Sequence, residues 1–257
     1  MDKETVLLNN GVRMPMVGLG VWQMEEGMET EKSVLWAIQA GYRLIDTATL
    51  YGNERSVGRV VRESGTPRGD IFVTTKLWPT DFSDPESAFH ASLSRLGLQY
   101  VDLYLIHWPA PAMERGIWQT LERLYESKLT RAIGVSNYGV RELEELQSYA
   151  KIMPAVNQVS FSPFSYKKDV LEYCAAHGIA LEAYSPLTRG RKLNNPRLGK
   201  IAVAHNKSPA QILIRWCLDH GAIAIPKSSN KQRIKENFDV FDFSLSPEEM
   251  QELDFLR

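Results

Sequence analysis

Four side chains that can transfer or stabilise a proton stand at or just beyond the ends of short apolar runs. Asp46, Lys76 and His107 each end such a run, and Tyr51 follows Asp46 by five residues. A free tyrosine has a pKa near ~10, and a neighbouring ammonium lowers that pKa by favouring the phenolate. An aspartate can hold the lysine charged and in place, and a histidine can orient a carbonyl oxygen. This set suits delivery of a proton to an oxygen that becomes an alkoxide when hydride reaches a carbonyl carbon.

Each of these residues also has a purely structural interpretation. Asp46 could cap a turn, Lys76 could be a surface lysine with a buried stem, and His107 could be a hydrogen-bonded core histidine. The other histidines stand at helix ends or within a helix, where structural roles suffice; they are His90, His177, His205 and His220. Taken together with Tyr51, the acid, the lysine and His107 favour a catalytic site.

Short apolar runs alternate with segments of helical periodicity along the chain, and they begin near Val17, Leu44, Ile71, Val101, Arg131, Ala155, Ile179 and Ala222. Several runs are continuous rather than alternating, as expected of strands covered on both faces. Eight such units in about 250 residues predict an α/β fold, a (β/α)8 TIM barrel. We expect residues 1–257 to form it as a single domain. In such a barrel the carboxyl ends of the strands carry the chemistry.

Three additions to the barrel are expected. Residues 5–8 and 12–15, joined by Asn9-Asn10-Gly11, predict an N-terminal β-hairpin. The stretch 196–220 is long enough for two helices, so one extra helix is expected before or within the seventh helical segment. Ser246-Pro247-Glu248-Glu249 begins a C-terminal helix with its own cap.

The composition favours an ordinary globular protein. Of 257 residues, 44% are hydrophobic and 24% are charged. The net charge of -1 does not favour binding to the negatively charged backbone of nucleic acid. No run approaches the ~18 apolar residues of a membrane span. Cys174 and Cys217 lie in apolar helical patterns and predict buried thiols in a reducing compartment. We therefore expect a cytoplasmic monomer that binds neither nucleic acid nor membrane and has no metal site.

These motifs resemble the signatures of the aldo-keto reductases. The resemblance rests on RLIDTA…YGNE over residues 43–54, VDLYLIHWP over 101–109, IGVSN over 133–137 and IPKS over 225–228. The resemblance extends from Val6 to about Asp254. Within the family, the chain is similar to the short bacterial members, including the 2,5-diketogluconate reductase group. It implies that Asp46, Tyr51, Lys76 and His107 form a catalytic tetrad with Tyr51 as the general acid.

The resemblance also implies NADPH as the cofactor. No Rossmann fingerprint is present, because Gln23 stands where the third glycine would belong. By position, the contacts to NADPH are Ser136, Asn137 and Gln158 at the carboxamide, Tyr184 on the nicotinamide ring, Ser185 and Leu187 at the pyrophosphate, Lys227, Ser228 and Arg233 at the 2′-phosphate, and Glu236 and Asn237 at the adenine. Further cofactor contacts are implied for Gly20, Val21, Trp22, Asp46 and Ser229.

Two basic runs bear on this assignment. Lys227, Lys231, Arg233 and Lys235 surround a helix start and would favour a phosphate, although a solvated basic face is the alternative. The second run, residues 189–192, follows the seventh strand. It could fold over the pyrophosphate or could be plain surface charge.

Aromatic residues follow three of the strands on the catalytic side. Trp22, Trp78 and Trp108 would wall a substrate pocket around Tyr51 and His107, unless they only pack the barrel rim. The segment 110–114 is short, and the chain ends at Arg257 directly after the expected terminal helix. Both features predict an open, shallow pocket and broad specificity.

The sequence thus predicts an enzyme that reduces aldehydes and ketones, a class that includes keto-sugars, with NADPH. The alternative is a non-catalytic NADPH-binding relative that serves as a structural or regulatory subunit, which an intact tetrad argues against. A Schiff-base aldolase using Lys76 would leave Tyr51, Lys227 and Arg233 unexplained.

Overall fold

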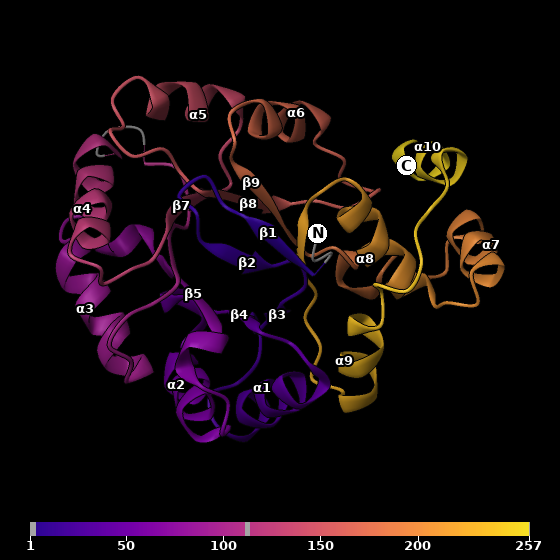
Figure 1. The fold of residues 1–257 in the computed structure, drawn as a ribbon, viewed down its shortest axis with the longest axis horizontal. Helices are drawn as coiled ribbons and strands as arrows, with labels where there is room; N and C mark the ends of the chain where they lie inside the picture. Colours follow the sequence, from indigo (N-terminus) through magenta and orange to yellow (C-terminus); the bar gives the residue numbers. More distant parts are fainter. Residues whose placement is uncertain (1–3, 111–113, 257) are drawn as a thin grey trace.

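Eight parallel strands curl into a barrel in this computed structural model, which describes residues 4–110 and 114–256. Their order around the barrel is β10-β9-β8-β7-β6-β5-β4-β3, so sequential strands are neighbours (Figure 1). The strands are β3 (Leu19–Gly20), β4 (Leu44–Asp46), β5 (Phe72–Leu77), β6 (Leu103–Ile106), β7 (Ile133–Ser136), β8 (Val156–Ser160), β9 (Ala180–Tyr184) and β10 (Ile223–Ile225). The predicted (β/α)8 barrel is confirmed.

The barrel closes where its first and last strands meet. Val17 forms a parallel bridge with Ala224, and Gly18 N donates to Ala224 O at 2.9 Å. A Cβ on Gly20 would lie 3.0 Å from the backbone oxygen of Ile225. Glycine therefore permits the close approach of the two backbones at this seam.

Helices surround the strands and cover their outer faces (Figure 1). They are α1 (Met28–Ala40), α2 (Glu54–Glu63), α3 (Pro85–Leu96), α4 (Glu114–Glu126), α5 (Val140–Gln147), α6 (Lys168–Ala176), α7 (Pro196–Ala204), α8 (Pro209–Asp219), α9 (Lys231–Phe238) and α10 (Pro247–Asp254). Both α7 and α8 lie between β9 and β10, which confirms the extra helix in the seventh helical segment. The C-terminal helix α10 is confirmed as well.

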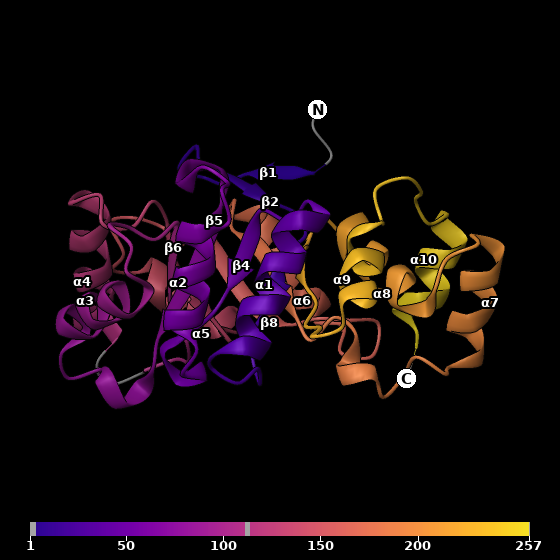
Figure 2. The ribbon, with the colours of Figure 1, turned by 90° about the horizontal axis from the view of Figure 1, so that it is seen from below.

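The N-terminal hairpin covers the amino end of the barrel (Figure 2). Strands β1 (Thr5–Leu7) and β2 (Arg13–Pro15) pair antiparallel, and Gly11 in the turn has φ 82°. The side-chain amides of Asn9 and Asn10 donate to Pro154 O and Arg131 O, on the segments that enter β8 and β7. With the amino end covered, the carboxyl end is left for a site.

Helix α10 is attached to α7 and α8 through two histidines. His205 lies 2.9 Å from Glu249, and His220 lies 2.8 Å from Asp254. Ser246 and Glu249 form a capping box at the start of α10. The structural roles expected for His205 and His220 agree with these contacts.

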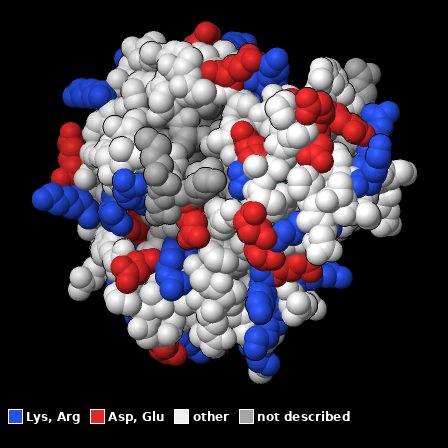
Figure 3. All heavy atoms as spheres, turned by 45° about the vertical axis from the view of Figure 1, so that its right-hand side comes forward, with Lys and Arg blue, Asp and Glu red and all other residues white. Residues whose placement is uncertain are grey.

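Cys174 and Cys217 are both buried and free. Within residues 4–110 and 114–256, no helix is long and apolar enough to cross a membrane, and no His, Cys, Asp or Glu cluster could hold a metal. On the face shown in Figure 3, acidic and basic side chains are interspersed. The single-domain organisation stays a prediction.

Candidate active site at the carboxyl end of the barrel

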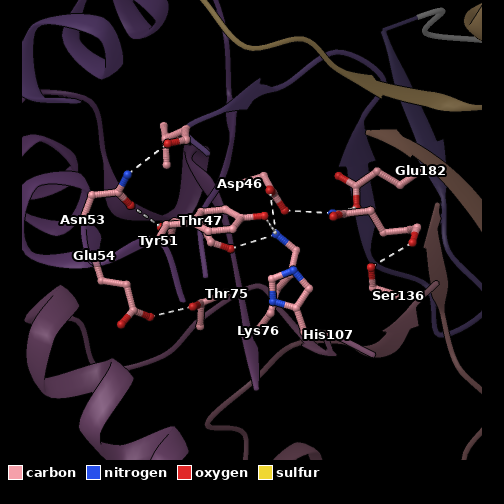
Figure 4. Close-up of polar contacts among 12 residues, drawn as sticks. Asp46, Thr47, Tyr51, Asn53, Glu54, Thr75, Lys76, His107, Ser136 and Glu182 are labelled. Atoms are coloured by element: carbon pink, nitrogen blue, oxygen red, sulfur yellow. Dashed lines mark hydrogen bonds and ion pairs between the residues drawn. The ribbon is translucent and has the colours of Figure 1, made fainter. Parts of the chain in front are cut away.

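Three neighbouring strands bring the four candidate catalytic residues together (Figure 4). Asp46 is the last residue of β4, Lys76 is the penultimate residue of β5, and His107 directly follows β6. Tyr51 ends a short 3-10 turn, η1 (Thr49–Tyr51), after β4. Because adjacent parallel strands end at the same edge of the barrel, these side chains converge there.

The loop that carries Tyr51 is held by a buried asparagine. The Asn53 amide donates to Val21 O at 2.9 Å and to Met24 O at 3.1 Å, and it accepts from Thr47 Oγ1 at 2.8 Å. Gly52 takes a left-handed conformation with φ 69°. The Tyr-Gly-Asn sequence therefore positions the phenol over the end of β4.

Lys76 connects the acid to the tyrosine. Its Nζ donates to Asp46 Oδ1 at 2.7 Å, to Thr47 O at 2.9 Å and to the Tyr51 hydroxyl at 3.3 Å. These contacts use all three ammonium hydrogens, and the side chain is fully buried. Burial lowers the pKa of Lys76, but Asp46 and Tyr51 outweigh it and raise that pKa to about 12. Lys76 is therefore charged at neutral pH.

The environment of Tyr51 keeps its proton in place. Burial raises the pKa of Tyr51 to about 12, while the Lys76 ammonium lowers it and Asp46 raises it. The effect of Lys76 has the direction that the sequence predicted. The net shift is upward because desolvation of the phenolate is the larger effect.

His107 is neutral and packed between aromatic rings. Burial, with Lys76 second, lowers the pKa of His107 to about 3. Its ring centroid lies 5.8 Å from that of Tyr51 and 5.0 Å from that of Trp78, both edge-on. Nδ1 is buried without a hydrogen-bond partner among the described residues. A neutral imidazole can donate a hydrogen bond to a ligand oxygen.

A cavity of about 1000 Å³ opens at this end of the barrel and contains most of the predicted site. Val21 and Lys76 are fully buried and do not line it. All other predicted residues do, namely Gly20, Trp22, Asp46, Tyr51, Trp78, His107, Trp108, Ser136, Asn137, Gln158, Tyr184, Ser185, Leu187, Lys227, Ser228, Ser229, Arg233, Glu236 and Asn237. Residues 111–113, in the short segment expected to leave the pocket open, lie outside the described residues.

Polar side chains at the inner end of the cavity are bonded to one another. The Asn137 amide donates to His107 O at 3.0 Å and to Ser136 Oγ at 3.1 Å, and its oxygen accepts from the Tyr184 hydroxyl at 2.9 Å. Gln158 Nε2 donates to Asp46 Oδ2 at 2.8 Å. These groups could bind an amide-bearing ligand.

The outer end of the cavity is cationic. Lys227 and Ser228 follow β10, and Asn230 caps α9 by accepting a hydrogen bond from Arg233 N at 3.0 Å. Lys227 lies 4.0 Å from Glu29 on α1. Cationic side chains beside a helix start form a site that suits a phosphate.

The loop after β9 reaches across the mouth. The Arg189 guanidinium lies 4.5 Å from the centroid of the Trp22 ring, which belongs to the loop after β3. Ser185, Thr188 and Arg189 all have positive φ, between 50° and 55°. The second basic run thus contributes Arg189 to the cavity wall.

A sequence model of the Aldo/keto reductase family matches residues 16–257. The chain belongs to this family. It is 52% identical to a Trypanosoma cruzi 9,11-endoperoxide prostaglandin H2 reductase over 98% of this chain and 90% of the relative. It is 50% identical to a Bacillus subtilis glyoxal reductase over 99% of this chain and 93% of the relative. The predicted family is confirmed.

Solved structures of aldo-keto reductases have the same fold. One from a Medee basin deep-sea metagenome library has a TM-score of 0.94 and 43% identity, over 97% of this chain and 93% of that one. A Bombyx mori aldo-keto reductase, solved in complex with NADP, has a TM-score of 0.90 and 37% identity over 97% of this chain and 91% of its own.

Several residues of this aldo-keto reductase line the cavity without having been predicted. Leu50 precedes Tyr51, and Asn230 is a cap residue before a basic helix, so local signals existed for both. The start of α8 also lines it, at Ser208, Pro209 and Ala210; Ser208 is a cap residue too, but the helix that follows is not basic. A fully buried glutamate, Glu182 in β9, bonds Gln158 at 2.8 Å. Its position, an acidic residue within an otherwise apolar strand, is the feature of the sequence that indicates a buried polar role for Glu182.

Proposed function

We propose that this aldo-keto reductase reduces aldehydes and ketones to alcohols, with NADPH as hydride donor and Tyr51 as proton donor. One observation carries the proposal. The buried Lys76 ammonium lies 2.7 Å from Asp46 and 3.3 Å from the Tyr51 hydroxyl, and Tyr51 lines the cavity. A phenol beside a fixed ammonium is suited to give up a proton to a developing alkoxide.

The residues around the cavity fit an extended dinucleotide phosphate. Polar groups of Ser136, Asn137 and Gln158 lie at the inner end, where they would hold the nicotinamide carboxamide beside Tyr184. Ser185 and Leu187 would contact the pyrophosphate. Lys227, Ser228 and Arg233 would bind the 2′-phosphate, with Ser229 beside them and Glu236 and Asn237 at the adenine. When bound, NADPH supplies the hydride. The related Bombyx mori structure contains NADP.

The chain's own residues handle the proton. With a pKa of about 12, Tyr51 is protonated at neutral pH and can donate its hydroxyl proton to the carbonyl oxygen. Lys76 then stabilises the phenolate, and Asp46 keeps Lys76 charged and aimed. The neutral His107 ring, placed between Tyr51 and Trp78, would donate a hydrogen bond that orients the carbonyl. Electrostatic contacts of this kind stabilise the transition state most where water is excluded.

The substrate is a neutral carbonyl compound held among indole rings. Trp22, Trp78 and Trp108 line the cavity near Tyr51 and His107, and Trp108 is 44% exposed at its rim. One relative is named a glyoxal reductase, which supports small aldehydes among the substrates. We further propose broad specificity and a single-domain, cytoplasmic monomer that binds no nucleic acid.

An assay of NADPH oxidation over a panel of aldehydes, ketones and keto-sugars tests the function. Tyr51→Phe should lower kcat by about 10²–10⁴-fold, the usual contribution of a general acid, while NADPH binding is nearly unchanged. Tyr173→Phe is the matched control, because its hydroxyl bonds Gln147 on the outer surface. Retained turnover in Tyr51→Phe would contradict the proposal. NADPH binding without turnover of any panel member would instead support the non-catalytic alternative.

A further inference from the structure

Glu182 lies inside the barrel and has no part in the proton transfer described above. It is the middle residue of β9 and is 0% exposed. In the parallel register it is the direct partner of Gln158 on β8. Its side chain therefore points into the same interior layer as that of Gln158.

One amide group joins Glu182 to the catalytic aspartate. Gln158 Nε2 donates to Asp46 Oδ2 and to Glu182 Oε2, at 2.8 Å in each case. Figure 4 shows Asp46 and Glu182 on either side of these contacts. Both hydrogens of the amide are used, and both partners are acceptors. The orientation of the Gln158 side chain, and with it the position of its carbonyl oxygen, is thereby set.

The charges in this layer do not balance if both acids are ionised. Asp46 is paired with Lys76 at 2.7 Å, whereas no cation contacts Glu182 and its Oε1 is buried without a partner among the described residues. An unpaired buried carboxylate is costly, and two carboxyl groups that share one site keep one proton between them. The group without a cation is the one that keeps it.

The titratable groups facing Glu182 come from one side of the barrel. They are Asp46 on β4, Lys76 on β5 and Tyr51 after β4. The neighbouring strands β8 and β10 carry no titratable side chain. Burial, followed by the Asp46 charge, raises the pKa of Glu182, and these effects outweigh the hydrogen bond from Gln158 and the Lys76 charge, which lower it.

We propose that Glu182 is a positioning residue that carries a proton at neutral pH and, through Gln158, holds Asp46 in the orientation that aims Lys76 at Tyr51. Loss of that proton adds a second negative charge to the layer. The added charge raises the pKa of Tyr51 and makes it a weaker acid. We therefore expect kcat to be at its maximum while Glu182 is protonated, and to fall as the pH rises and Glu182 ionises.

Two substitutions at Glu182 separate positioning from simple packing. Glu182→Leu removes the acceptor, and we expect kcat at neutral pH to fall about tenfold, the effect of one buried hydrogen bond. Glu182→Gln keeps an acceptor and cannot ionise. It should restore most of kcat and abolish or move the alkaline fall of the wild-type profile. Glu122→Gln, at a buried glutamate on α4, is the control and should leave the profile unchanged.

A wild-type pH profile of the same shape as that of Glu182→Gln overturns the inference. Should Glu182→Leu fail to fold, the glutamine variant alone decides it. A second readout needs no turnover. The infrared difference spectrum of wild type minus Glu182→Gln at neutral pH should contain the carbonyl band of a protonated carboxylic acid, and its absence overturns the inference.

The inference rests on the proposed function, but the two fail differently. Retained turnover in Tyr51→Phe removes the proposed function whatever Glu182 does. Loss of turnover in Tyr51→Phe, with identical wild-type and Glu182→Gln profiles, leaves the proposed function standing and removes only the role of Glu182.

Discussion

The Lys76 ammonium lies 3.3 Å from the Tyr51 hydroxyl, and its charge opposes the effect of burial on the pKa of that phenol. The same ammonium is bound to Asp46 at 2.7 Å. Lys76 thus makes the half-buried Tyr51 a better acid than its desolvation alone would allow, and removal of Lys76 should be informative.

Lys76→Met should lower kcat by about 10²-fold or more, because Tyr51 then lacks the charge that stabilises its phenolate. It should also destabilise the fold by about 3–5 kcal/mol, because Asp46 becomes an unpaired buried charge. The double variant Asp46→Asn/Lys76→Met should regain most of that stability without activity. Steady-state kinetics and urea unfolding measure both effects, and a double variant that also regains activity would contradict the role of Lys76.

Lys227→Ala/Arg233→Ala should raise the dissociation constant for NADPH about 10²-fold or more, since each charge-assisted phosphate contact contributes about 1.5–3 kcal/mol. Binding of NADH, which lacks the 2′-phosphate, should change little. Fluorescence titration with both cofactors gives the ratio. Lys235→Ala is the control, because this exposed lysine of α9 does not line the cavity. An equal loss of affinity for both cofactors in Lys227→Ala/Arg233→Ala would argue against the phosphate site.

Arg189→Ala should speed release of NADPH by about 2–5-fold, because it removes the stacking of the guanidinium on Trp22 at the cavity mouth. Stopped-flow displacement measures the release rate. Arg191→Ala removes a neighbouring charge that does not line the cavity. If both variants release NADPH at the same increased rate, the loss of a positive charge near the cavity, rather than the loss of the contact with Trp22, causes the faster release.

His107 should make the fold sensitive to acid. Its pKa is about 3 in the folded protein, below the value of an unfolded histidine near ~6.5, so the unfolded state binds more protons between these values. The contribution of neutral His107 to stability is complete above pH ~6.5 and falls by up to about 1.4 kcal/mol per unit as the pH decreases.

Urea unfolding between pH 5 and 7 tests this expectation. The wild type should lose stability relative to His107→Gln as the pH falls. His90→Gln, at an exposed histidine of α3, should follow the wild type. Parallel curves for wild type and His107→Gln would show that His107 is not buried as a neutral ring.

The barrel and its catalytic edge were predictable from the sequence because parallel strands have to end together. Short apolar runs that alternate with helices form a parallel barrel, and Asp46, Lys76 and His107 stand at or next to the carboxyl ends of neighbouring strands. These three side chains therefore lie at the same end of the barrel. The Tyr51-Gly-Asn turn is equally local, since Gly52 supplies the left-handed conformation and Asn53 anchors the loop.

Contacts between distant strands were decided only by the tertiary structure. Gln158 reaches Asp46 from 112 positions away in the sequence, and Glu182 joins them through one shared amide. The balance of charge and burial at Tyr51 also depends on atoms from several strands, so the sequence could predict the effect of Lys76 but not the net shift. Local patterns determine which residues stand at strand ends, whereas the closed barrel determines which of these side chains contact one another in its interior.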